Sequence, residues 1–86
     1  MGSQHIWTSR DEEGRKREVR VTKFGGHWKF QAKFQDEEEW TYYEVPLLAD
    51  LQELRDIVYR KYQRRRASAE DFAAVEKMLR EQSRNA

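Results

Sequence analysis

The chain has 86 residues, with 17 Lys and Arg against 16 Asp and Glu, so its net charge is +1 at pH 7. This length allows one small domain. The sequence contains no cysteine, which excludes a disulfide framework and zinc sites built on thiolates. No apolar run approaches the ~20 residues of a membrane span, and the N-terminus lacks the pattern of a signal peptide. We therefore expect a cytoplasmic protein that does not contact a membrane.

The N-terminal part of the chain predicts one strand ahead of a tight turn. Residues 1–4 are expected to be a disordered N-terminus or a cloning remnant. The sequence Asp11-Glu12-Glu13-Gly14 is typical of a hairpin turn that is closed by a left-handed glycine. Such a turn would fold residues 5–9 back along the chain and place Trp7 near Val19.

The clearest local pattern is a pair of alternating runs, residues 18–24 and 27–34, joined by Gly25-Gly26. Two such runs around a Gly-Gly pair predict a β-hairpin with a two-residue turn. The resulting register places Val21 opposite Phe30. One face of the hairpin is then apolar, and the other carries Arg20, Thr22, His27, Lys29, Gln31 and Lys33.

Residues 39–45 predict a further strand, because aromatic and β-branched residues dominate this segment. Alternation along it places Trp40 and Tyr42 toward the core. Thr41 and Tyr43 are then expected on the polar side of the sheet.

The next segment predicts an amphipathic helix. Asp50 and Glu53 have the spacing of a capping box at its start. The helix is expected to end near Arg64, Arg65 and Arg66, because cations favour the negative end of a helix. Tyr62 lies on the apolar stripe and is expected in the core, whereas Tyr59 is expected at the surface.

A second helix is predicted after Ser68, which has the capping-box spacing with Asp71. Residues 5–83 are then expected to form a single domain, and residues 84–86 a frayed C-terminus. The predicted fold class is α+β: an antiparallel three- or four-stranded β-meander with two C-terminal α-helices packed on one face.

Few residues suit catalysis or metal binding. His5 and His27 have no recognisable nucleophile or orienting carboxylate beside them, so a structural or solvated role is favoured for both. Gly25-Gly26 lacks the helix that follows a phosphate-binding loop. The acidic run at residues 36–39 lacks the spacing and the turn glycine of an EF-hand loop, and it is expected to be solvated. We therefore expect no enzyme activity, cofactor, metal site or small-molecule substrate.

The near-neutral total conceals a segmented charge pattern. Residues 15–33 contain seven cations and one acid, residues 34–56 eight acids and one cation, and residues 57–66 five cations and no acid. Because electrostatic fields act over about 8–10 Å in physiological salt, such segments matter more than the sum. The pattern predicts basic surfaces on the hairpin and at the end of the first helix.

These basic surfaces make nucleic acid the favoured partner of a non-enzymatic binding module, through phosphate contacts and a tyrosine that could stack on an unpaired base. The residues expected to bind are Arg20, Lys29, Gln31, Lys33, Tyr43, Arg64, Arg65 and Arg66. A solvated sheet face is the ordinary alternative for the first group, since a one-sided sheet exposes such residues to water. Helix capping and solubility are the alternative for the three arginines.

The element order over about residues 19–62 resembles the DNA-binding domains of plant AP2-type factors and some integrase N-terminal domains. The resemblance implies contact with DNA through a sheet face, but it rests on no shared motif and assigns no residue. The competing hypothesis is a protein–protein interaction or homodimerisation domain of a small bacterial protein, in which acidic and basic segments pair between chains.

Overall fold

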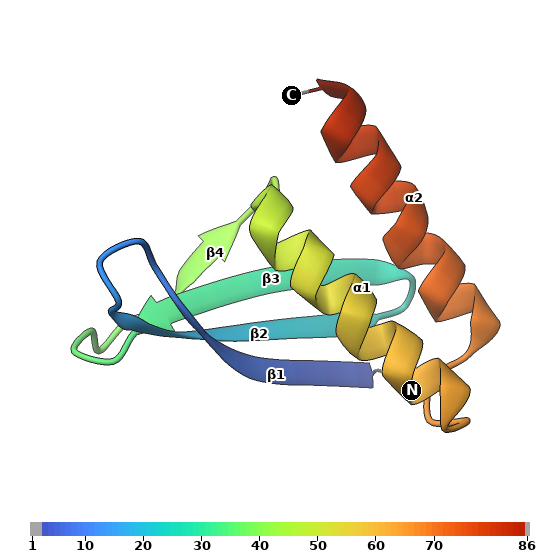
Figure 1. Ribbon diagram of the computed structural model, residues 1–86, viewed down its shortest axis with the longest axis horizontal. Helices are drawn as coiled ribbons and strands as arrows, with labels where there is room; N and C mark the ends of the chain where they lie inside the picture. Colours follow the sequence, from blue (N-terminus) through green and yellow to red (C-terminus); the bar gives the residue numbers. More distant parts are fainter. Residues whose placement is uncertain (1–2, 86) are drawn as a thin grey trace. The chain divides into compact units, whose positions relative to one another are not determined.

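Figure 1 shows the computed structural model, which describes residues 3–85. Four strands form one antiparallel sheet in the order β1-β2-β3-β4, and two helices follow it in the chain. The six elements are β1 (Ser3–Arg10), β2 (Lys16–Phe24), β3 (His27–Phe34), β4 (Thr41–Tyr43), α1 (Leu48–Gln63) and α2 (Ala69–Asn85). The predicted α+β class, with an antiparallel meander followed by two C-terminal helices, is confirmed.

The chain divides into two compact units between Val45 and Pro46. The first unit holds the sheet and the second holds the helices, and each is described here by itself. The packing of the helices on one face of the sheet stays a prediction, as does the single domain over residues 5–83. None of the helices within residues 3–85 has the length and apolar character needed to cross a membrane.

The ends of the described chain are more regular than expected. Ser3 pairs with Lys23 and Gln4 with Thr22, so β1 begins two residues before its predicted start. At the other end α2 continues to Asn85, two residues past the predicted boundary. The expectations for residues 1, 2 and 86 lie outside the described residues.

The β2–β3 hairpin has the predicted register. Gly25 and Gly26 both have positive φ angles, of 56° and 82°, as a type I′ turn requires. Val21 lies opposite Phe30. A Cβ at either glycine would be strained in this conformation, which explains why two adjacent glycines join these strands.

The β1–β2 turn is also formed as predicted. Gly14 has a φ of 82°, and its N–H donates to the Asp11 carbonyl at 3.0 Å. The Asp11 carboxylate accepts hydrogen bonds from the backbone N–H groups of Glu13 and Arg15, at 2.9 and 2.8 Å. Trp7 consequently pairs with Val19, as expected.

One face of the sheet is buried and the other is polar. Val19, Val21, Phe30 and Ala32 are almost fully buried, and the register places all four on the same face. We call the opposite side the polar face; its residues are Gln4, Ile6, Thr8, Arg10, Lys16, Glu18, Arg20, Thr22, Phe24, His27, Lys29, Gln31, Lys33 and Tyr42.

The first helix starts differently from its prediction. It is preceded by Leu47, whose side chain makes no capping hydrogen bond, and Asp50 lies buried in the first turn. The prediction that Asp50 and Glu53 form a capping box is wrong, because the helix begins before Asp50. The Ser68 cap of α2 is confirmed, since its Oγ accepts the Asp71 backbone N–H at 3.1 Å.

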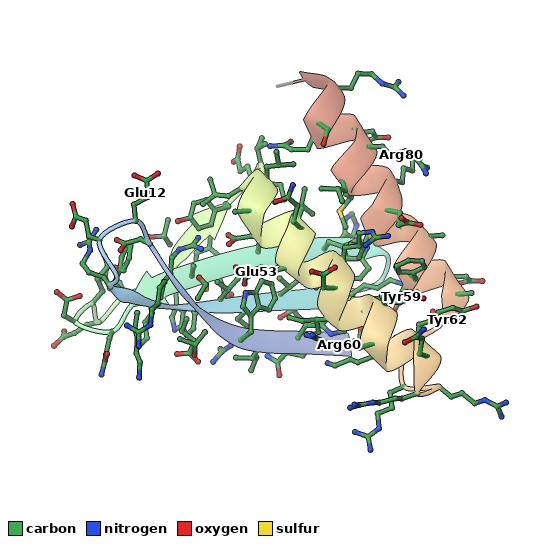
Figure 2. All side chains as sticks on the ribbon, in the orientation of Figure 1. Glu12, Glu53, Tyr59, Arg60, Tyr62 and Arg80 are labelled. Carbon is green, nitrogen blue, oxygen red and sulfur yellow. The ribbon has the colours of Figure 1, made fainter. Side chains whose placement is uncertain are left out.

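Two tyrosines of α1, Tyr59 and Tyr62 (both labelled in Figure 2), contact the same aromatic residue of α2. The Tyr62 ring stacks on Phe72 with 5.8 Å between ring centres, and the Tyr59 ring lies 5.4 Å from the same residue. Both tyrosines are 41% exposed. The core position expected for Tyr62 is wrong, because the buried stripe of α1 ends one turn earlier, at Val58.

Candidate nucleic-acid interface

The candidate interface is built on the polar face by the register of β2, β3 and β4. Arg20 of β2 lies opposite Gln31 of β3, which in turn lies opposite Tyr42 of β4. Because side chains on one face repeat every two residues, Lys29 and Lys33 flank Gln31 on the same strand. The sheet thus brings three predicted cations together on one surface.

Two aromatic residues complete this surface, and both were expected in the core. Tyr42 pairs with Gln31, so it lies on the polar face. The ring centre of Trp40 lies 4.5 Å from Cζ of Arg20 and 5.3 Å from Nζ of Lys33. The predicted core positions of Trp40 and Tyr42 are therefore wrong.

The register of β4 also places Tyr43 on the opposite face of the sheet from the one expected. It pairs with Phe30 and lies on the face of the buried residues, where the Arg17 guanidinium is 5.4 Å from its ring centre. Thr41, opposite Ala32, also lies on that face. Tyr43 was expected to stack on a base from the polar face, and this placement is wrong. Tyr42 instead occupies the place on the polar face that was expected for Tyr43.

The members of the surface differ in their exposure. Lys29 is exposed, and its Nζ lies 4.5 Å from the ring centre of Tyr42, which is 57% exposed. Lys33 and Arg20 are half-buried, and the buried Nε of Arg20 has no hydrogen-bond partner within residues 3–85. Gln31 is only 8% exposed, so it offers little surface to a ligand. The accessible groups are thus two lysines, part of one arginine and two aromatic rings.

We call residues 40 and 42, together with Arg20, Lys29 and Lys33, the cation–aromatic cluster. Cations held over aromatic rings each contribute about 0.5–1 kcal/mol at exposed sites. These contacts hold the long side chains of the cations close to the rings. The cluster therefore presents positive charge and flat apolar surface side by side.

The three arginines after α1 form a separate structure in the second unit. Arg65 has a φ of 60°, and its N–H donates to the Tyr62 carbonyl at 3.0 Å, while the Arg66 N–H donates to the Lys61 carbonyl at 2.6 Å. This is the Schellman pattern that ends many helices. All three side chains, from Arg64 to Arg66, are exposed. We call this segment the arginine turn.

The two histidines were expected to have a structural or solvated role, and the acidic run at residues 36–39 was expected to be solvated. His27 is exposed beside the glycine turn, and the buried His5 stacks on Trp28 with 6.3 Å between ring centres. Residues 36–39 are exposed, and Glu37 accepts the Phe34 backbone N–H at 2.8 Å. Within the described part of the chain, no three His, Cys, Asp or Glu side chains gather where they could hold a metal ion.

Trp40 and Tyr42 are the residues of the surface that sequence reasoning missed. The segment carries aromatic residues at positions 40, 42 and 43, so alternation alone allows either side to face the core. Comparison with protein-family models, with curated proteins and with solved structures found no match to this chain. The candidate interface therefore rests on the chemistry of its own residues.

Proposed function

We propose that this protein is a small, non-enzymatic and cytoplasmic module that binds single-stranded nucleic acid through the cation–aromatic cluster. The observation that supports this proposal is the interleaving of Trp40 and Tyr42 with Arg20, Lys29 and Lys33 on one sheet face. Proteins that bind single strands combine these two elements: cations that follow the phosphate backbone and aromatic rings on which bases stack.

The aromatic component favours a single strand over a duplex. In a duplex the faces of the bases are covered by their neighbours, whereas an unpaired base can lie flat on an exposed ring such as Tyr42. Stacking and phosphate contacts tolerate any sequence, because every base has a flat face and every nucleotide a phosphate. We therefore expect limited sequence specificity. The arginine turn supplies a second set of phosphate contacts in this proposal.

The competing explanation is that the cation–ring contacts only stabilise a solvated face. The two explanations differ in what happens when a strand is added. An NMR amide titration with short single-stranded DNA and RNA that lack terminal phosphates, at low and then moderate salt, separates them. We expect shifts at Arg20, Lys29, Lys33, Trp40 and Tyr42 that weaken as salt is added. Amides of the cluster that do not move would overturn the proposal.

A charge-matched pair of variants sharpens this test. Lys29→Gln with Lys33→Gln removes two charges from the cluster, and Lys77→Gln with Arg80→Gln removes two exposed charges from α2. Both double variants have the same net charge. Only the first is expected to weaken binding strongly, because non-specific attraction to the whole protein would fall equally in both.

Self-association is the second candidate function, and one feature of the sheet favours it. β1 is an edge strand of eight residues, and no other strand within residues 3–85 pairs with its outer side. Ile6, on its polar face, is 50% exposed. An unpaired edge can add a strand from a second copy. Sedimentation without nucleic acid tests this: a mass that rises with concentration and falls back in Ile6→Lys supports a dimer, and a constant monomer mass excludes it.

A further inference from the structure

A hollow of about 590 Å³ lies beside the β1–β2 turn, the turn on which Glu12 is labelled in Figure 2. It is lined by Arg10, Gly14, Arg15, Lys16, Gln35 and Asp36. Three of these six residues are cations and one is an acid. We call this hollow the turn pocket.

Arg15 is held in place on two sides. Its Nε donates to the Asp11 carboxylate at 2.8 Å, and its guanidinium lies 4.3 Å from the ring centre of Phe34. Asp11 is itself fixed by the backbone N–H groups that it accepts in the turn. The outer nitrogens of the Arg15 guanidinium make no hydrogen bond within residues 3–85. They are therefore available to an incoming ligand at little cost in side-chain entropy.

Arg10 and Lys16 bring two further cations to the same place. One outer nitrogen of Arg10 donates to the Gly14 carbonyl at 2.8 Å, and its other N–H groups make no hydrogen bond within residues 3–85. Lys16 lies opposite Arg10 across the β1–β2 pair and is exposed. Asp11, Asp36 and Glu13 offset part of this charge, with a Glu13 carboxylate oxygen 3.6 Å from Nε of Arg15. Binding must therefore depend on N–H donors held in position more than on the net field.

Such a set of donors suits a compact anion with several oxygens. Guanidinium groups bind phosphate through paired N–H groups, and an ammonium adds a further charged donor. We propose that the turn pocket binds a phosphate monoester. A free mononucleotide and the terminal phosphate of a nucleic-acid strand both carry this group.

The position of the pocket connects it to the cation–aromatic cluster. Lys16 and Gln35 also line a second hollow of about 190 Å³, together with Thr8 and Glu18 of the polar face. Glu18 lies opposite Lys33. A strand bound on the cluster could therefore extend toward the turn pocket with its terminal phosphate. The proposal that the phosphate belongs to the end of a bound strand rests on the proposed function. The proposal that the pocket binds a free phosphate monoester does not.

The first test uses inorganic phosphate, adenosine 5′-monophosphate and adenosine in separate NMR titrations. We expect phosphate and the monophosphate to shift the amides of Arg10, Gly14, Arg15 and Lys16, and adenosine to leave them unchanged. If neither phosphate probe moves these amides, or if adenosine moves them equally, the turn pocket is not a phosphate site.

Two pocket variants with opposite expected effects on affinity follow. A variant that only disturbed folding would not bind more tightly, so the second variant separates loss of binding from loss of structure. Arg10→Gln with Lys16→Gln should weaken binding of the monophosphate by about tenfold or more, because charge-assisted hydrogen bonds are lost. Asp36→Asn should strengthen it, because a carboxylate is removed from the lining. The double variant of Lys77 and Arg80 in α2 is the charge-matched control. Unchanged affinity in both pocket variants would overturn the assignment.

Oligonucleotides with and without a terminal phosphate distinguish the two possible ligands, the end of a nucleic-acid strand and a free mononucleotide. If the strand end is the ligand, a terminal phosphate at one end should tighten binding, and the gain should disappear in Arg10→Gln with Lys16→Gln. If the monophosphate binds but the terminal phosphate adds nothing, the source is the free nucleotide. A strand without terminal phosphates that still shifts the cluster leaves the proposed function intact even when the pocket fails.

Discussion

The Lys29 ammonium lies 4.5 Å from the ring centre of Tyr42, although the register pairs Tyr42 with Gln31, two residues further along β3. Lys29 thus reaches diagonally across the β3–β4 pair. A cation over an exposed ring contributes about 0.5–1 kcal/mol, whereas a base stacked on an aromatic ring contributes about 1–3 kcal/mol. A base can therefore displace the ammonium from the ring, and the released Lys29 remains beside the bound strand to contact a phosphate.

This exchange predicts that the ring of Tyr42, and not its hydroxyl, carries affinity. Tyr42→Ala should weaken binding of a single strand by about 5- to 150-fold, the equivalent of one stacked base. Tyr42→Phe keeps the ring and should bind within about twofold of the unchanged protein, since only a hydroxyl is lost. Fluorescence anisotropy with a labelled oligonucleotide measures both. Equal losses in the two variants would show that the hydroxyl, and not stacking, makes the contact.

The lysines of the cluster predict a change in salt dependence. For single strands, each neutralised phosphate contributes about −0.7 to the slope of log affinity against log salt concentration. Lys29→Gln with Lys33→Gln should therefore reduce the magnitude of that slope by about 1.4. Lys77→Gln with Arg80→Gln should leave it unchanged. A slope that falls equally in both variants would indicate diffuse attraction instead of contacts at the cluster.

The β2–β3 hairpin was predictable because two local signals agree there. Gly25-Gly26 fixes the turn type, and one slip in register would move every apolar residue to the wrong face. β4 has neither signal. It is a three-residue strand after a six-residue connection, so the connection and not the alternation decides which residues face the core. The errors at Trp40, Tyr42 and Tyr43 follow from that difference.

The turn pocket was not predictable from the charge segments alone. Arg10 lies outside the basic segment of residues 15–33, and only the β1–β2 pairing brings it opposite Lys16. The position of Arg15 depends on Asp11, whose carboxylate serves the turn and the guanidinium at once. The sequence indicates the turn, but not that its folding assembles three cations around a hollow.

The Asp11 carboxylate predicts a pH dependence of the β1–β2 turn. The Arg15 backbone N–H, and with it the Arg15 side chain, lowers the pKa of Asp11 below its ordinary value of 3.8. A pKa that is lower in the folded protein means that ionised Asp11 stabilises the turn above about pH 3.8, and that this contribution is lost as the pH falls through the folded-state pKa. An NMR titration of the carboxyl carbon measures the pKa directly.

Arg15→Gln separates the two causes of that shift. The backbone N–H remains in this variant, so the pKa of Asp11 should rise only part of the way toward its ordinary value. A complete return would show that the guanidinium, and not the turn backbone, holds the carboxylate. A pKa at or above 3.8 in the unchanged protein would contradict the hydrogen bonds of the turn.

The arginine turn predicts opposite effects on stability and on binding. Arg65 has a φ of 60°, a conformation that costs a residue with a Cβ about 1–2 kcal/mol and costs glycine little. Arg65→Gly should therefore stabilise the helical unit by about 0.5–1 kcal/mol in urea denaturation followed by circular dichroism. Arg64→Gly, at a φ of −91°, relieves no such strain and should destabilise it.

The same Arg65→Gly variant removes one exposed cation from the arginine turn. If this turn contacts a phosphate, the variant should bind a single strand more weakly and lower the magnitude of the salt slope by about 0.7, although the helical unit is more stable. Arginine at a position that favours glycine would then be explained by binding. A gain in stability with unchanged affinity would limit the interface to the sheet and assign the three arginines to the helix end alone.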